Sequence, residues 1–380
     1  MTPATRQPEG GIGSAPVPPF PMAGNRAPPG LVWTPRPGKA RPMSRTQHID
    51  TEITLRHGGL RATLMPLGAR LSALWVPDAT GALADVIVGY DKAADYAAQD
   101  GYAGAICGRY ANRIAGGRFA HGGRRWSLDR NEAGNHLHGG RDGMHGLTWR
   151  VAAQDGRSAV FALTLPDGHM GYPGRLQAHV RYWLEAPGRL VIDRRATTDA
   201  PTPVNLVSHA YFNLSGQAAG PVTDHRLWVD AARYTPVDGQ MLPTGTLAPV
   251  QGTPFDFRQA RPLRAGLEAL PGGYDVNLCL AARTGAGPAA CARLEDPASG
   301  RWLTVWTDAP GLQVYTAGHM GEGQRGKGGV PMHRFGGVAL ESQAFPDAPN
   351  QRGFPDATLL PGQVYTHRTV YAFGARPADG

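Results

Sequence analysis

The chain has 380 residues, including 52 Gly and 34 Pro; only 18% are charged, and the formal net charge is +8. This composition favours many short strands joined by turns over long amphipathic helices. A basic chain suggests nucleic-acid binding, but no Lys/Arg run reaches five residues, and residues 1–42 alone carry five basic residues against one Glu. We therefore expect no nucleic-acid partner.

Cysteine content and hydropathy bear on the compartment. The chain has three cysteines, Cys107, Cys279 and Cys291. An odd, sparse set argues against a disulfide framework and predicts a reducing, cytoplasmic location. Since no stretch approaches 18 consecutive apolar residues, we expect no membrane-spanning helix.

The first 43 residues differ in composition and hydrophobic pattern from the rest of the chain. They contain 11 Pro and 6 Gly and almost no apolar periodicity. Such a segment cannot bury enough surface to offset the entropy lost on ordering, so the sequence predicts a disordered N-terminal extension over residues 1–43. It has no apolar core of the kind that a secretory signal needs. Residues 44–376 are expected to form one domain.

Strand patterns begin near Ile49. Glu52–Arg56 alternates, His57-Gly58-Gly59 provides a hairpin turn, and Leu60–Met65 reads as the returning strand. Further short strands, bounded by Gly, Asp and Pro, are predicted at Leu71–Val76, Asp85–Gly89, Ser158–Leu165, Leu176–Leu184, Leu190–Thr197, Arg226–Val229, Trp302–Thr307 and Val364–Phe373. Helical patterns are limited to Asp91–Gln99 and Pro262–Ala269. The sequence therefore predicts an all-β domain.

Polar residues interrupt an apolar segment at Gly108–Ile114. Arg109, Asn112 and Arg113 lie between apolar neighbours. One interpretation is that Arg109 or Arg113 bridges a carboxylate for structural reasons, because arginine is rarely buried without a partner. The other is that Asn112 and Arg113 offer amide and guanidinium donors to a polyhydroxylated ligand.

Two histidines follow in the stretch His136-Leu137-His138-Gly139-Gly140. On a strand, this spacing would place both imidazoles on one face, as a metal pair requires. No third ligand with metal-site spacing is visible, so we expect no metal. The two glycines allow a close backbone approach, which suits the rim of a ligand site.

The apolar run from Asn205 to Leu214 contains one imidazole, His209. Such a histidine can be a core residue, or it can exchange a proton near neutral pH. Asp275 follows the turn Gly272-Gly273, where it can cap the turn or carry out chemistry.

Two further polar side chains stand in apolar surroundings. Gln313 lies between Leu312 and Val314, and an amide that points inward from a strand must be hydrogen-bonded. Glu341 follows three apolar residues, which predicts a partly buried carboxylate with a raised pKa.

Together these stretches resemble the successive signature stretches of the aldose 1-epimerases, or galactose mutarotases. The matching segments occur in that family's order and are Gly108–Ile114, Asn135–Gly140, Asn205–Gly216, Gly252–Arg258, Tyr274–Asn277, Pro310–Thr316 and Leu340–Gln351. The resemblance covers about residues 49–374. It implies a large two-sheeted antiparallel β-sandwich, a small-molecule aldose as substrate, and no metal or organic cofactor.

The resemblance also implies a role for each site residue. Glu341 would be the base that takes the proton of the C1 hydroxyl, and His209 the acid that protonates the ring oxygen. The residues that would bind the sugar hydroxyls are Asn112, Arg113, His138, Asp275 and Gln313. Mutarotation only moves protons, so two positioned acid/base groups meet its chemical requirement. A sugar also needs an apolar platform, for which Tyr211, Phe212 and Phe345 are candidates.

The chain departs from the family pattern at two positions. Ser208 stands where the family usually has Asn, and Val276 stands where His is common. Neither is a proposed catalytic group, but we expect Val276 to remove a polar contact near Asp275 and so to affect sugar preference.

Other classes remain open at this stage. They are an epimerase of the same fold that acts on another sugar or on a phosphosugar, a glycoside hydrolase that uses Asp275 and Glu341, and a non-catalytic sugar-binding protein. The last would be expected to lose His209 or Glu341, and both are present. We expect a monomer or a weak homodimer.

Overall fold

The computed structural model describes residues 51–99, 101–281, 287–321 and 323–376. All of them belong to the unit Thr46–Gly380, and the predicted extension at residues 1–43 lies outside them. Within the described ranges the α-helices are α1 (Ala93–Ala98) and α2 (Arg264–Leu267). They fall inside the two regions predicted to be helical, and neither is long and apolar enough to cross a membrane.

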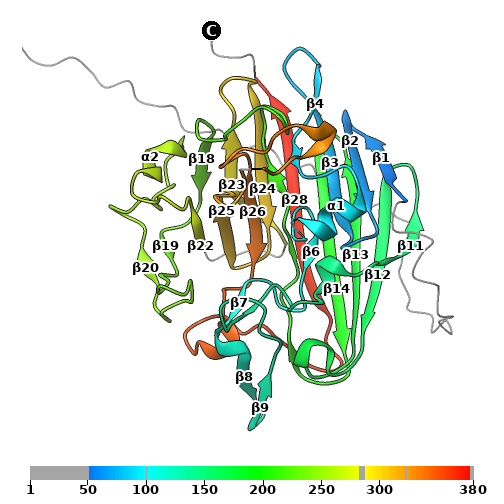
Figure 1. The fold of residues 1–380 in the computed structure, drawn as a ribbon, viewed down its shortest axis with the longest axis vertical. Helices are drawn as coiled ribbons and strands as arrows, with labels where there is room; N and C mark the ends of the chain where they lie inside the picture. The colour runs from blue at the N-terminus through cyan, green and yellow to red at the C-terminus, as the bar shows by residue number, and fades with distance from the viewer. Residues whose placement is uncertain (1–50, 100, 282–286, 322, 377–380) are drawn as a thin grey trace, which may run out of the picture. The chain divides into compact units, whose positions relative to one another are not determined.

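The larger of the two main sheets has nine strands among the described residues (Figure 1). In spatial order they are β11 (Arg150–Gln154), β12 (Ser158–Leu165), β13 (Leu176–Glu185), β14 (Arg189–Thr198), β28 (Tyr365–Ala375), β24 (Arg301–Thr307), β23 (Ala289–Glu295), β18 (Arg226–Val229) and β21 (Arg261–Pro262). All neighbouring strands pair antiparallel.

The second main sheet has seven strands, again counting described residues only. Their spatial order is β20 (Ala248–Pro249), β19 (Arg233–Tyr234), β22 (Asp275–Cys279), β25 (Gly311–Tyr315), β26 (Val338–Gln343), β17 (Tyr211–Phe212) and β5 (Ile87–Val88). This sheet is also antiparallel throughout. The predicted all-β class with two large antiparallel sheets is therefore confirmed.

Smaller antiparallel sheets complete the described fold. One has four strands, β1 (Ile53–His57), β2 (Leu60–Met65), β3 (Arg70–Pro77) and β4 (Leu83–Asp85). The others are the pairs β6 (Ile106–Cys107) with β16 (Val207–Ser208), β7 (Arg113–Ile114) with β10 (His136–Leu137), β8 (Arg118–His121) with β9 (Arg124–Ser127), and β15 (Thr202–Pro203) with β27 (Thr358–Leu359).

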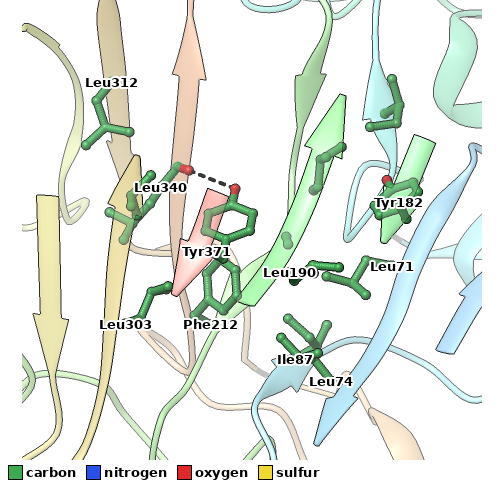
Figure 2. Close-up of a cluster of buried hydrophobic side chains, with 14 of the residues drawn as sticks. Leu71, Leu74, Ile87, Tyr182, Leu190, Phe212, Leu303, Leu312, Leu340 and Tyr371 are labelled. Carbon is green, nitrogen blue, oxygen red and sulfur yellow. Dashed lines mark hydrogen bonds between the residues drawn. The ribbon is translucent and has the colours of Figure 1, made fainter. Parts of the chain in front are cut away.

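The main apolar core joins the inner faces of the sheets. Leu312 and Leu340 come from the seven-stranded sheet, and Leu303 and Tyr371 come from the nine-stranded sheet. Figure 2 shows these side chains in one buried cluster, where the Tyr371 hydroxyl donates to the Leu340 carbonyl at 3.3 Å. Burying each such side chain is worth about 1.5–3 kcal/mol. The core therefore determines which face of each sheet is buried and which face can carry polar residues.

Most predicted strands are observed, and one differs. The pattern predicts a single strand over Asp85–Gly89, whereas the chain leaves the four-stranded sheet at Asp85 and enters the seven-stranded sheet at Ile87. One Asp85 oxygen, Oδ1, accepts the backbone N–H groups of Leu74 and Ile87 at 3.0 and 3.1 Å. A side chain that satisfies the backbone locally replaces the ladder at this point.

Candidate active site

The strands β22, β25 and β26 bury one face in the core and carry polar residues on the other. Val276, Leu312, Val314 and Leu340 lie in the core. Because side chains alternate along a strand, their neighbours point to the opposite face. The residues on that face are Asp275, Asn277, Gln313, Tyr315, Ala339, Glu341 and Gln343.

The strand register places the polar residues in rows. Asn277 pairs with Gln313, and Gln313 pairs with Glu341. The Gln343 amide donates to Asn277 Oδ1 and to Gln313 Oε1, both at 3.0 Å. The Gln313 amide in turn donates to Asp275 Oδ1 at 2.5 Å. The amides thus fix the orientation of one another and of the Asp275 carboxylate.

His209 reaches the same face from the adjoining segment between β16 and β17. Its backbone is held on both sides, because its N–H donates to Ala105 and its carbonyl accepts from Gly104, at 2.9 and 2.8 Å. Tyr211 pairs antiparallel with Ala339. His209, two residues before Tyr211, therefore lies near Glu341, two residues after Ala339. His209 Nε2 lies 3.7 Å from Glu341 Oε1.

The residue Glu341 is 2% exposed, which is deeper than the predicted partial burial. Its Oε2 atom has no hydrogen-bond partner among the described residues. Burial, with a smaller contribution from the negative charge of Asp275, raises the pKa of Glu341 well above its ordinary value. The predicted raised pKa is confirmed, and a strongly perturbed carboxyl group of this kind is typical of a functional site.

His138 lies beside His209, with ring centroids 5.2 Å apart. Its Nδ1 accepts the backbone N–H of Asn112 at 3.2 Å. Burial, with the positive charges of neighbours such as His209 and Arg113, lowers the pKa of His138 well below its ordinary value. The ring is therefore neutral with its proton on Nε2, which makes it a hydrogen-bond donor.

The two arginines of the first motif have different roles. Arg113 forms a bidentate ion pair with Glu132, and its Nη1 lies 4.0 Å from Asp275 Oδ2. Arg109 instead donates to the carbonyls of Pro173 and Gly174 at 2.7 and 2.9 Å. Arg109 is therefore structural but bridges carbonyls rather than the expected carboxylate.

Aromatic rings surround the His209 imidazole. Tyr211 contacts it edge-on with ring centroids 5.0 Å apart, and Tyr102 and Tyr315 lie at 6.1 and 6.3 Å. Tyr102 also contacts His138 and His145. Of the three predicted platform residues, Tyr211 is the one whose ring contacts His209.

Of the other two platform candidates, Phe212 is wrong and Phe345 remains a prediction. Phe212 points into the core, where it packs on Tyr371 (Figure 2) and also on Phe373. Phe345 packs on Phe354 in a separate apolar cluster. Alternation explains Phe212, because Tyr211 and Phe212 must face opposite sides of the sheet.

The His-x-His expectation is also wrong. Strand β10 ends at Leu137, and His138 has φ of +50°, so the chain leaves the strand conformation between the two rings. His136 instead lies 2.7 Å from the Asp129 carbonyl and 2.6 Å from the Tyr172 hydroxyl. Among the described residues no three His, Cys, Asp or Glu side chains come together as a metal site.

The departures at Val276 and Ser208 lie away from the site. Val276 packs in the main core, on the face opposite Asp275. The side chain at this position therefore does not point toward the Asp275 carboxylate. Ser208 lies beside the hydroxyls of Tyr182 and Tyr371, which also belong to the core. The expected effect of Val276 on sugar preference is therefore not supported.

Contacts join all seven predicted site residues into one cluster. The links run from Asn112 to His138, His209, Glu341, Gln313, Asp275 and Arg113. Residues not singled out from the sequence also belong to it, namely Tyr102, Glu132, His145, Asn277, Tyr315, His319 and Gln343. The alternating pairs Asp275/Asn277, Gln313/Tyr315 and Glu341/Gln343 were the signal that could have found the strand residues.

Comparison with known proteins gives the family. The aldose 1-epimerase family model matches residues 51–372. The chain is 40% identical to mouse galactose mutarotase over 323 residues, which is 85% of this chain and 93% of that protein. It is 37% identical to the aldose 1-epimerase of Escherichia coli K12, over 84% of this chain and 94% of that protein.

Solved structures agree with the sequence comparisons. The GalM/aldose epimerase homologue from C. elegans superposes with a TM-score of 0.80 at 29% identity, covering 86% of this chain and 99% of that one. Galactose 1-epimerase from Lactobacillus acidophilus superposes with a TM-score of 0.73, also at 29% identity, covering 85% and 94%. The chain belongs to the aldose 1-epimerase family, and the predicted resemblance is confirmed.

Proposed function

We propose that this protein is an isomerase that interconverts the α and β anomers of aldoses such as galactose and glucose. Family membership supports the class of reaction. The observation that carries the proposal is that His209 Nε2 and Glu341 Oε1 face each other at 3.7 Å on a buried polar surface. Two titratable groups at this separation can act on two atoms of one small substrate.

The spacing fits the hemiacetal group of an aldose. Its hydroxyl oxygen and its ring oxygen are bonded to the same carbon, so an acid and a base that serve them must stand close together. In ring opening, the Glu341 carboxylate takes the proton of the C1 hydroxyl, and a C1=O double bond forms as the C1–O5 bond breaks. The His209 imidazolium gives its proton to O5.

Ring closure reverses these proton transfers. After rotation about C1–C2, the O5 hydroxyl attacks the other face of the aldehyde, His209 takes back the O5 proton, and Glu341 returns its proton to O1. Both groups recover their starting charges, and no electrons or other groups are exchanged. The proposed reaction therefore requires no cofactor.

The raised pKa of Glu341 suits this cycle. A raised pKa means that the carboxyl group holds a proton readily, as it must while the sugar is open. Glu341 and His209 together hold one proton in each state that can react. His209 carries it when the sugar is in the ring form, and Glu341 carries it when the sugar is the open aldehyde. Loss of that proton, or gain of a second one, would stop catalysis.

The surrounding groups match the hydroxyls of a sugar. Arg113 and the Nε2–H of His138 are donors, Asp275 is an acceptor, and the amides of Asn112 and Gln313 can be either. Tyr211, beside His209, offers an apolar ring face. We assign these five polar residues to substrate binding and Glu341 and His209 to catalysis.

We further propose that the protein acts on a free sugar in the cytoplasm, as a monomer or a weak homodimer. The low cysteine content supports the reducing compartment. Size-exclusion chromatography with light scattering measures the oligomeric state directly.

Polarimetry tests the proposed activity. Freshly dissolved α-D-galactose and α-D-glucose change rotation slowly on their own. We expect the protein to speed the approach to the same final rotation in proportion to its concentration, and the ratio of the two rates will define the preferred sugar. A folded protein that accelerates neither sugar nor any other aldose would contradict the proposal.

A further inference from the structure

The side chain of Glu132 holds two of the nitrogen atoms of Arg113. Arg113 Nε donates to Glu132 Oε2 at 2.8 Å, and Nη2 donates to Oε1 at 2.5 Å. The third nitrogen, Nη1, faces Asp275 Oδ2 at 4.0 Å. That distance is an ion-pair distance but is too long for a hydrogen bond.

The backbone around Glu132 is held by a tight turn. Glu132 and Asn135 exchange backbone hydrogen bonds of 3.2 and 2.7 Å, and Ala133 and Gly134 between them have positive φ. The Asn135 side chain accepts the N–H of Gly116 at 2.9 Å, which ties the turn to the segment after Arg113. The Glu132 carboxylate is thus presented to Arg113 from a defined position.

Without Glu132, Arg113 would have a different best partner. An arginine beside an aspartate favours a direct, often bidentate, ion pair. Such a pair would use the donors of Arg113 and the acceptors of Asp275 on each other. Burial lowers the pKa of Arg113, but the hydrogen bonds to Glu132 and the nearby charges outweigh it and raise the pKa above its ordinary value.

We propose that Glu132 is a positioning residue that keeps Arg113 and Asp275 apart, so that one sugar hydroxyl bridges them. The bridging oxygen accepts a hydrogen bond from Arg113 Nη1 and donates its own proton to Asp275 Oδ2. This inference rests on the proposed function, because it assumes that the site binds an aldose. It assigns to Glu132 a role in substrate affinity and none in proton transfer.

The first test compares Glu132→Gln with a matched control, Glu295→Gln. Glu295 also accepts an arginine Nε–H at 2.5 Å, from Arg293, but it lies on β23 in the nine-stranded sheet. The measurements are kcat and KM for mutarotation, the Kd of D-galactose by calorimetry, and Tm. We expect Glu132→Gln to raise KM and Kd by about tenfold to a hundredfold, the range for losing one charge-assisted hydrogen bond, with kcat nearly unchanged. Glu295→Gln should change neither constant.

The second test is a double-mutant cycle with Asp275→Asn. If Glu132 acts by preventing an Arg113–Asp275 ion pair, removing the Asp275 charge removes the reason for its effect. Adding Glu132→Gln to Asp275→Asn should then raise Kd by less than about threefold. An effect of Glu132→Gln that is the same in both backgrounds would overturn the separating role.

Other outcomes of these experiments would overturn the role of Glu132 or the proposed function. A Glu132→Gln variant with unchanged KM and Kd, or one that loses kcat alone, would overturn the inference. A wild-type protein that binds galactose without accelerating mutarotation would contradict the proposed function, while the Kd comparison would still decide the role of Glu132. A wild-type protein that binds no aldose would overturn both.

Discussion

The Glu341 carboxyl group is buried without a complete set of hydrogen bonds, which is unusual for a carboxylate in a folded protein. Leaving such a group unsatisfied costs roughly 1–3 kcal/mol or more. The register of β25 and β26 places Glu341 opposite Gln313, on the polar face of the sheet. Function explains why a stability cost of this kind is retained.

Substitution of the two proposed catalytic groups should separate chemistry from folding. Glu341→Gln keeps the size of the side chain, His209→Asn keeps a polar group in a smaller side chain, and each removes the exchangeable proton. We expect each to reduce kcat roughly 10²- to 10⁴-fold, with Tm equal to or above that of the wild type for Glu341→Gln because a buried carboxyl is replaced. Near-wild-type turnover in either variant, measured by polarimetry, would exclude the assigned mechanism.

The pH profile should report the Glu341 environment. Because its pKa is raised, kcat/KM should begin to fall with decreasing pH above the ordinary carboxyl value of 4.5. Asp275→Asn removes a negative charge that favours protonation of Glu341, so the pKa should drop and the acid limb should move to lower pH. Asp256→Asn, at a surface ion pair with Arg258, is the control and should leave the limb in place. A limb that is unchanged in Asp275→Asn would contradict the assigned coupling.

At the scale of the elements, the sequence predicted where the strands lie better than it predicted which side chains face the core and which face the site. The residue types and their neighbours singled out His209, Glu341 and the five proposed binding residues as candidates, and the family resemblance supplied the role proposed for each. They did not show that Tyr211 and Phe212 separate to opposite sides, or that Val276 faces the core. Those assignments depend on which face of β17 and β22 the nine-stranded sheet covers, which is a tertiary fact.

Contacts between segments far apart in the chain could not be predicted from the sequence either. Glu132 and Arg113 are 19 residues apart, and Tyr102 reaches His138 and His209 from a separate loop. No periodicity links such residues, because loops carry no fixed side-chain repeat. The predicted strand at Asp85–Gly89 failed for a related reason, since the side chain of Asp85 redirects the backbone between two sheets.

The segment that carries His138 depends on a glycine. At Gly139, with φ of +90°, a Cβ atom would lie 1.8 Å from the Gly108 carbonyl oxygen. The close approach predicted for this Gly-Gly pair therefore occurs against backbone rather than ligand. We expect Gly139→Ala to displace His138, lowering both Tm and kcat/KM. Gly220→Ala, where φ is +92° and nothing lies within 4 Å, controls for backbone strain alone. It should lower the stability of the wild type by about 1–2 kcal/mol, which is less than the cost of Gly139→Ala. Equal effects of the two substitutions on kcat/KM would argue against the contact.

At the scale of the whole molecule, all the assigned site residues fall between Asn112 and Glu341, and the family match begins at residue 51. The composition of residues 1–43 predicts a segment that adds little to a core. We expect a variant that lacks residues 1–43 to keep the wild-type kcat, KM and Tm. A loss of activity or of thermal stability in this variant would show that the segment contributes to the folded enzyme.

The proposed interconversion of α and β anomers can be followed at equilibrium by nuclear magnetic resonance. D-galactose in D₂O gives separate H1 signals for its α and β anomers. We predict that the wild-type protein transfers magnetisation between them at a rate proportional to its concentration, that Glu341→Gln does not, and that hydrogen at C1 and C2 is retained, because only hydroxyl protons move. Absence of exchange with any aldose, or replacement of the C2 hydrogen by deuterium, would contradict assignment of this chain as a 1-epimerase.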